Sequence, residues 1–207
     1  MGKVENNKIQ KQTSLLNTAF ELFITKGVSK TTIAEISEKA GLAKGTFYLY
    51  FKDKYDIRNK LISHESSKLF TYAVDALHRE DAEGNMTFEE KIVFIANNVI
   101  DHLNEDKTLL MFISKNLSWG IFKEALTTNV AEEDINFKDV FYDMITEDAA
   151  TILDPEIMLF MIIELVSSTC YSAILYSEPA GIEEIKPYLF DTICSIIEGH
   201  RQNNDSK

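Results

Sequence analysis

The chain has 207 residues, of which 45% are hydrophobic and 26% charged, and this balance excludes an intrinsically disordered chain. Glycine (8) and proline (3) are scarce, so an all-α fold is favoured over short strands joined by tight turns. The formal net charge is −12, but residues 1–60 carry 11 basic and 6 acidic residues, against 10 and 27 in residues 61–207. A basic segment attracts phosphates, so the acidic total does not exclude nucleic-acid binding by the N-terminal part.

Three helices are predicted in the N-terminal part. Apolar residues recur at helical spacing over residues 8–26, and Gly27 follows as a C-cap. Thr32 and Glu35 have the spacing of a capping box, in which each side chain bonds the backbone amide of the other, so a second helix begins here. After a glycine turn, a short third helix is expected over residues 44–51; it is too short to be stable without its neighbours.

The remaining helices follow in chain order. Asp53 is suited to cap a connecting helix that begins at Lys54 and runs to about residue 78, where a polar stretch interrupts it. Apolar residues spaced three and four apart predict further helices over residues 88–104, 109–126, 137–153, from Pro155 to the Pro179 turn, and from there to about Gly199.

One of these helices is unusually apolar. Residues 157–176 are long enough to cross a bilayer, but Glu164 lies inside the run and no Lys or Arg flanks it, so we expect a core helix or one shared between subunits. The N-terminus lacks the apolar core of a signal peptide, and Cys170 and Cys194 have no metal-like spacing. We therefore expect a cytoplasmic protein without a membrane anchor, disulfide scaffold, metal site or cofactor.

A helix, a glycine turn and a short helix make up a helix-turn-helix. The runs TTIAEI (residues 31–36) and AGLAKGTFYLYF (residues 40–51), followed by Asp53 and Lys54, resemble the signature of the TetR/AcrR family. The resemblance covers roughly residues 9–60. It implies an N-terminal three-helix DNA-binding domain (residues 1–53), and a C-terminal helical bundle for effector binding and dimerisation (residues 54–207) whose first helix is the connector.

The resemblance implies DNA contact at matched positions, which are Thr32, Lys44, Gly45, Thr46, Tyr48, Tyr50 and Lys54. Lys44 can reach a guanine edge or a phosphate, whereas Thr32 either caps its helix only or also meets a phosphate. Phe47 and Phe51 are expected on the inner face of the short helix. Leu42, Ala43 and Leu49 depart from the polar residues that some members carry there, which leaves the base specificity open.

For residues 61–207 the resemblance implies an effector pocket and a homodimer formed by the last two helices, in which Ile185, Leu189, Ile193 and Ile196 form a stripe. Glu164 in an apolar helix needs a partner, either a cationic ligand or a buried tyrosine, serine or lysine. The candidates for the pocket, each of which could equally be plain core, are Phe94, Met111, Phe112, Trp119, Phe122, Tyr142, Met161, Glu164 and Tyr171.

The predicted function is a transcription regulator, not an enzyme. It would be a dimeric repressor, released by an unknown small molecule, on palindromic double-stranded operator DNA; repression is implied by the resemblance alone. A helical enzyme is disfavoured because the histidines lie in no catalytic motif; they are His64, His78, His102 and His200. The alternative is a helical adaptor or ligand-binding protein with this fold but no operator, which would tolerate loss of Lys44, Tyr48 and Lys54.

Overall fold

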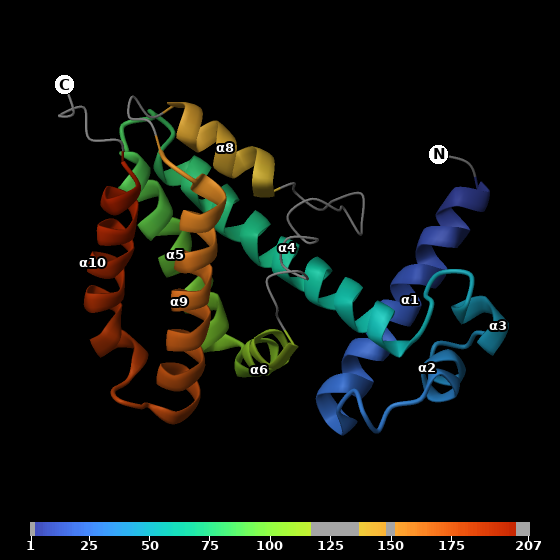
Figure 1. Cartoon of the computed structure of the whole chain (residues 1–207). Helices are drawn as coiled ribbons and strands as arrows, with labels where there is room; N and C mark the ends of the chain where they lie inside the picture. The colour runs from blue at the N-terminus through green and yellow to red at the C-terminus, as the bar shows by residue number, and fades with distance from the viewer. Residues whose placement is uncertain (1–2, 117–136, 148–151, 202–207) are drawn as a thin grey trace.

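The computed structural model describes residues 3–116, 137–147 and 152–201. Its helices are α1 (Lys3–Lys26), α2 (Ile33–Lys39), α3 (Lys44–Phe47), α4 (Lys54–Glu80), α5 (Phe88–Glu105), α6 (Lys107–Asn116), α8 (Phe137–Glu147), α9 (Pro155–Tyr176) and α10 (Ile182–His200). The described ranges contain no strand, only one antiparallel bridge between Ile152 and Arg201. The predicted all-α fold is confirmed, with three helices at one end and a helical bundle at the other (Figure 1).

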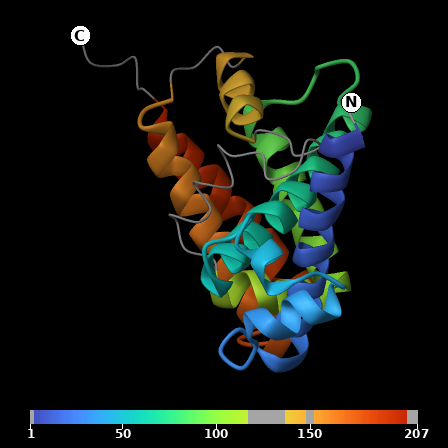
Figure 2. The ribbon, with the colours of Figure 1, turned by 90° about the vertical axis from the view of Figure 1, so that its right-hand side faces the viewer.

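The three N-terminal helices close around a small apolar core that includes the first turn of α4. Leu15, Ile36, Phe47 and Ile57 come from the four elements in turn, and all are fully buried. Gly27, which follows α1, has φ +80°, a conformation that glycine adopts without steric cost and that lets the chain reverse toward α2. This core holds α2 and α3 at the end of the molecule seen in Figure 2.

Helix α4 connects the two ends of the molecule. The Asp53 carboxylate accepts hydrogen bonds from the amides of Tyr55 (2.7 Å) and Asp56 (2.9 Å), which satisfies donors that the first turn cannot pair. From there α4 runs diagonally past α6 to α5 and α8 (Figure 1). The predicted helix from Lys54 is present, and it contacts α1 at one end of the molecule and α5 and α8 at the other.

In the C-terminal part, α5 packs against α4, α9 and α10. Two ion pairs fix α10 on α5: the Arg201 guanidinium lies 2.6 Å from the Glu89 carboxylate, and the Lys186 ammonium contacts the Asp101 carboxylate. Hydrogen bonds to Asp101 and Glu183 raise the pKa of Lys186 against the opposing effect of burial, so this lysine stays charged. These pairs hold α10 in register on α5.

Two predicted helix ends are wrong. The short third helix ends at Phe47 and not at Phe51, because the amides of Leu49 and Tyr50 bond carbonyls three residues back and tighten the chain into turns. The helix expected over residues 137–153 has its last described helical residue at Glu147. Leu153 lies outside it, since its amide donates to the His200 carbonyl (2.7 Å) before the chain turns into α9. The predicted part of α6 beyond Asn116 lies outside the described residues.

Helix α9 is only partly covered by its own chain. It is long and apolar enough to cross a membrane, yet only 33% of its most apolar stretch is buried. Its uncovered side includes Ile157, Phe160 and Met161. Part of the apolar stripe on α10, which was expected to contact a second subunit, packs inside the single chain, because Leu189 and Ile193 are buried.

Candidate DNA-binding site

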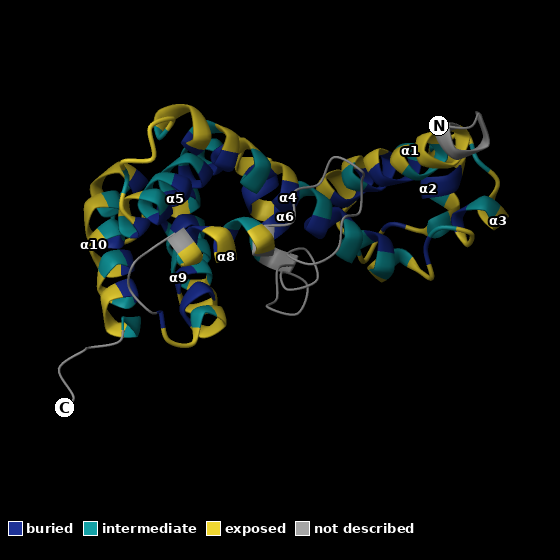
Figure 3. Ribbon diagram, turned by 90° about the horizontal axis from the view of Figure 1, so that it is seen from above, coloured by how far each residue is buried: buried dark blue, intermediate teal, exposed yellow. Residues whose placement is uncertain are grey.

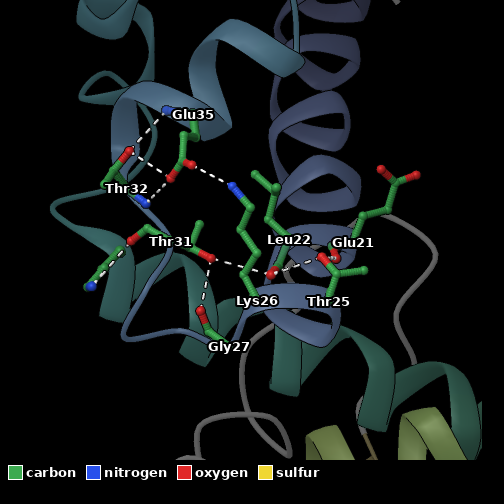
Figure 4. Close-up of polar contacts among 9 residues, drawn as sticks. Glu21, Leu22, Thr25, Lys26, Gly27, Thr31, Thr32 and Glu35 are labelled. Carbon is green, nitrogen blue, oxygen red and sulfur yellow. Dashed lines mark hydrogen bonds and ion pairs between the residues drawn. The ribbon is translucent and has the colours of Figure 1, made fainter.

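The start of α2 is fixed by the predicted capping box (Figure 4). The Glu35 amide donates to the Thr32 hydroxyl oxygen (3.2 Å), and the Thr32 amide donates to the Glu35 carboxylate (2.9 Å). The Thr32 hydroxyl also donates to that carboxylate (3.0 Å), so its hydrogen is already engaged. Thr32 is exposed, but its capping role is the one that the geometry displays.

The loop before α2 is anchored from both sides. The buried Thr31 hydroxyl lies within hydrogen-bond distance of the carbonyls of Leu22 (3.3 Å) and Gly27 (2.9 Å). The Lys54 ammonium donates to the carbonyls of Ser29 (2.9 Å) and Thr31 (3.2 Å). Lys54, expected to contact phosphate, therefore holds this loop with two hydrogens, and one remains for a phosphate.

A carboxylate with a strongly lowered pKa lies at this helix start. The Lys26 ammonium lies 2.6 Å from the Glu35 carboxylate and, with the Thr32 amide and hydroxyl, lowers the Glu35 pKa from 4.5 to about 2. The ionised form is favoured in the folded chain, so the stabilisation is fully present above pH 4.5 and is lost as the pH falls toward 2. The capping box therefore persists at neutral pH.

The Lys26→Met variant is expected to raise the Glu35 pKa toward 4.5 without reaching it, because Thr32 still donates two hydrogen bonds. The measurement is an NMR titration of the Glu35 side-chain carboxyl. Lys39→Met is the matched control, since the Lys39 ammonium pairs with Glu21 (2.7 Å) and not with Glu35. An unchanged pKa in Lys26→Met would show that Lys26 does not hold this carboxylate.

Helix α3 has one buried and one exposed side. Phe47 is fully buried and lies against the Phe51 ring (centroids 5.4 Å apart), as predicted for the inner face. Lys44 and Gly45 are exposed, and Tyr48 leaves 52% of its surface exposed while its ring meets the edge of Phe47. Figure 3 shows α3 at the extreme end of the molecule. The side of α3 that faces outward thus presents a cation, a backbone without Cβ and a phenol.

The other predicted contacts are less exposed, and a residue that was not predicted as a contact lies between them. Thr46 and Tyr50 are half-buried, and Tyr50 packs against the core. Leu49 is 79% exposed beside Tyr48. An exposed leucine on such a helix can pack against a thymine methyl group. The exposure of Leu49 could have been inferred only from its position midway between Phe47 and Phe51, which both face the core.

A second site candidate is an apolar cavity of about 100 Å³ in the C-terminal bundle. Helices α4, α5, α6 and α9 line it. None of the described pocket candidates contributes to its wall: Phe94, Met111, Phe112, Tyr142, Met161, Glu164 and Tyr171. Trp119 and Phe122 lie outside the described residues.

The physical reasons differ among the candidates. Phe112 is buried edge-on against Phe20 of α1, with ring centroids 5.2 Å apart. Met161 and Glu164 lie on the uncovered side of α9, so the carboxylate expected in apolar surroundings is exposed in the single chain. The Tyr171 hydroxyl meets the Tyr176 hydroxyl (3.2 Å) near the end of the same helix. The wall of the cavity is mainly aliphatic, with Phe70 as its described aromatic residue.

Residues 15–61, which span this helix-turn-helix, match the profile described as bacterial regulatory proteins, tetR family. This segment is thus similar to the DNA-binding domain of the tetR family. Among curated relatives, the HTH-type transcriptional regulator YvdT of Bacillus subtilis (strain 168) is 39% identical over 77 residues, which are 37% of this chain and 36% of YvdT. The fatty acid metabolism regulator protein of the same organism is 30% identical over 102 residues, 49% of this chain and 50% of that protein.

The fold of the chain also has solved counterparts. The transcriptional regulator FadR from Bacillus subtilis, in complex with stearoyl-CoA, superposes with a TM-score of 0.61 and 20% identity, over 90% of this chain and 98% of FadR. At this identity the likeness shows the fold alone. The chain spans about a third to a half of the length of the curated relatives described above.

Proposed function

We propose that the chain is a DNA-binding transcription regulator that acts as a dimer. Residues 1–53 form the DNA-binding domain and residues 54–207 the effector-binding and dimerisation domain, with α4 as the connector. The paired α3 helices bind the two halves of a palindromic operator, and an effector in the C-terminal domain releases the dimer from DNA, which makes it a repressor. The observation that carries this proposal is the outward side of α3, supported from behind by Phe47.

The contacts are assigned by exposure and chemistry. Lys44 donates to a guanine edge or phosphate, Gly45 lets the backbone approach the DNA, and Tyr48 and Leu49 meet phosphate and a thymine methyl group. Thr46 and Tyr50, half-buried, add contacts at the margin. Thr32 and Lys54 mainly hold the helix start and loop that surround α3. The third ammonium hydrogen of Lys54 is available to a phosphate, whereas the amide and the hydroxyl of Thr32 both donate to Glu35. The basic balance of residues 1–60 favours this end of the molecule for DNA.

The uncovered side of α9 supports a second copy as its partner. A helix this apolar with exposed apolar side chains needs an apolar neighbour. Two features argue against a bilayer as the neighbour of α9. Glu164 lies midway along the helix on its uncovered side, and the flanking residues are acidic: Asp154, Glu156 and Glu178. Packing of α9 on its copy therefore explains the exposed Ile157, Phe160 and Met161.

The Met161→Asp variant is expected to weaken this dimer about a hundredfold, because two buried methionines would each lose about 1.5 kcal/mol of apolar contact. The measurement is sedimentation equilibrium over a concentration series. Ile24→Asp on α1 is the control, since Ile24 is similarly exposed (39% against 42%) but distant from α9. A dimer that persists unchanged in Met161→Asp would place the interface elsewhere.

The structure offers a physical route from effector to DNA. Leu110 and Ile113 of α6 line the cavity, and Phe112 of the same helix meets Phe20 of α1. Helix α4 likewise lines the cavity with Leu69 and begins beside α3. A ligand that shifts α6 or α4 therefore shifts the DNA-binding domain and changes the separation of the two α3 helices.

The test is selection of bound sequences from a random duplex pool at low salt, with the purified full chain and no added ligand. We expect enrichment of a palindrome whose half-sites lie about one helical turn, or a multiple of it, apart. An adaptor with this fold would enrich nothing. Enrichment only after a ligand is added would contradict release by effector and indicate an activator.

A further inference from the structure

The wall of the C-terminal cavity has a distinct chemistry. It is built mainly from aliphatic side chains, among them Leu69, Ile95, Val99, Leu110 and Ile162. The described wall contains no charged side chain. A charged group placed there would lose its hydration without an ionic partner, which costs far more than apolar packing returns. The cavity is therefore suited to an uncharged ligand group.

Serine hydroxyls are the polar side chains of the described wall, one each from α4, α6 and α9: Ser66, Ser114 and Ser167. Ser66 is only 4% exposed, yet its hydroxyl makes no hydrogen bond to any described residue. Other helical hydroxyls in the chain bond the carbonyl four residues back, as Thr71 does to Ser67 (2.9 Å) and Ser195 to Asp191 (2.9 Å). Ser66 thus faces the cavity with its hydrogen-bonding capacity unused.

An unpaired hydroxyl in an apolar site is costly, and a ligand oxygen or hydroxyl that pairs with it recovers the loss. The preceding turn of α4 repeats the feature, because the buried Ser63 hydroxyl also lacks a partner in the described residues. The cavity volume is about 100 Å³, smaller than the roughly 150 Å³ cavity that binds benzene with room to spare, so the buried part of a ligand is no larger than about a five-carbon ring.

We propose that this cavity binds a small neutral molecule, or the neutral end of a larger one, whose single hydroxyl or carbonyl oxygen hydrogen-bonds to Ser66. The inference rests on the effector control proposed above, and it names the chemical class of that effector. Charged ligands, including the cation considered for Glu164, are excluded from this site by its wall. Packing against the aliphatic wall limits the size of the ligand, and the hydrogen bond to Ser66 selects a ligand that carries an oxygen.

The test compares three five-carbon probes on the full chain without DNA: cyclopentane, cyclopentanol and cyclopentylammonium. Binding is followed by methyl NMR shifts of the isoleucines that line the cavity and by calorimetry. We expect cyclopentanol to bind most tightly and cyclopentylammonium not to bind. Ser66→Ala should weaken cyclopentanol about tenfold while leaving cyclopentane within about twofold, because only the alcohol loses a hydrogen bond.

Two controls locate the effect. Ala96→Leu, which adds bulk to the cavity wall, should abolish binding of every neutral probe, whereas Ser195→Ala, an exposed helical serine, should change none. Absence of binding to the wild type, equal binding of the ammonium probe, or an equal loss for alcohol and alkane in Ser66→Ala would each overturn the proposal. Because no DNA is present, these outcomes are separate from failure to select an operator.

Discussion

The Lys44→Ala, Tyr48→Ala double variant is expected to bind the selected operator about a thousandfold more weakly than the wild type. Each dimer would lose four contacts, and a base or phosphate contact is worth about 1–3 kcal/mol, of which the lower value suffices for this loss. Both side chains are exposed, so the fold should be retained. Fluorescence anisotropy at one fixed salt concentration measures the change, and circular dichroism checks the helix content.

The matched control for this variant is Lys68→Ala, Tyr72→Ala on α4. Tyr72 is as exposed as Tyr48 (51% against 52%), and Lys68 is an exposed lysine, but both lie outside the DNA-binding domain. The control removes the same charge and the same aromatic area, so a general electrostatic effect would weaken both proteins alike. Equal losses would contradict the role of α3, as would near-normal binding of the Lys44→Ala, Tyr48→Ala protein.

The Phe47→Ala variant is expected to lower the free energy of unfolding by about 3–5 kcal/mol, the usual cost of truncating a buried phenylalanine. Phe47 is fully buried where α3 meets the core, and its ring contacts both Tyr48 and Phe51. Because α3 has one helical turn, it cannot retain its conformation without this anchor. Urea denaturation followed by circular dichroism measures the loss.

The neighbouring Tyr48→Ala change is the control, with an expected loss below about 1 kcal/mol because the side chain is half exposed. Phe47→Leu should recover part of the stability by refilling the site. A Phe47→Ala protein as stable as the wild type would show that α3 does not depend on this core. The pair of adjacent substitutions thus separates the stabilising and DNA-facing sides of α3.

The DNA-binding end was predictable from the sequence because its signals are local. The capping box of Thr32 and Glu35, the Asp53 cap and the glycine after α1 each act within a few residues, and each appears where the sequence placed it. The inward Phe47 followed from helical spacing. The short length of α3 did not, since it depends on turns after Phe47 that no residue type specifies.

The C-terminal cavity was not predictable, because it arises where four helices meet at long sequence separation. Residue type favoured aromatic and methionine side chains, but Phe112 is used against α1 and Met161 lies on the uncovered side of α9. The wall consists of aliphatic residues that look like ordinary core in the sequence, and the significant Ser66 looks like a neutral helix residue. Only packing shows that its hydroxyl faces a cavity.

The most direct test of the account is photo-crosslinking from α3 to DNA. Tyr48, and in a second protein Tyr72, is replaced by p-benzoylphenylalanine, and each protein is irradiated on the selected duplex. The account predicts crosslinks from position 48 in both half-sites and none from position 72. Crosslinks from position 72, or none from position 48 in a protein that still binds the duplex, would contradict DNA recognition by α3.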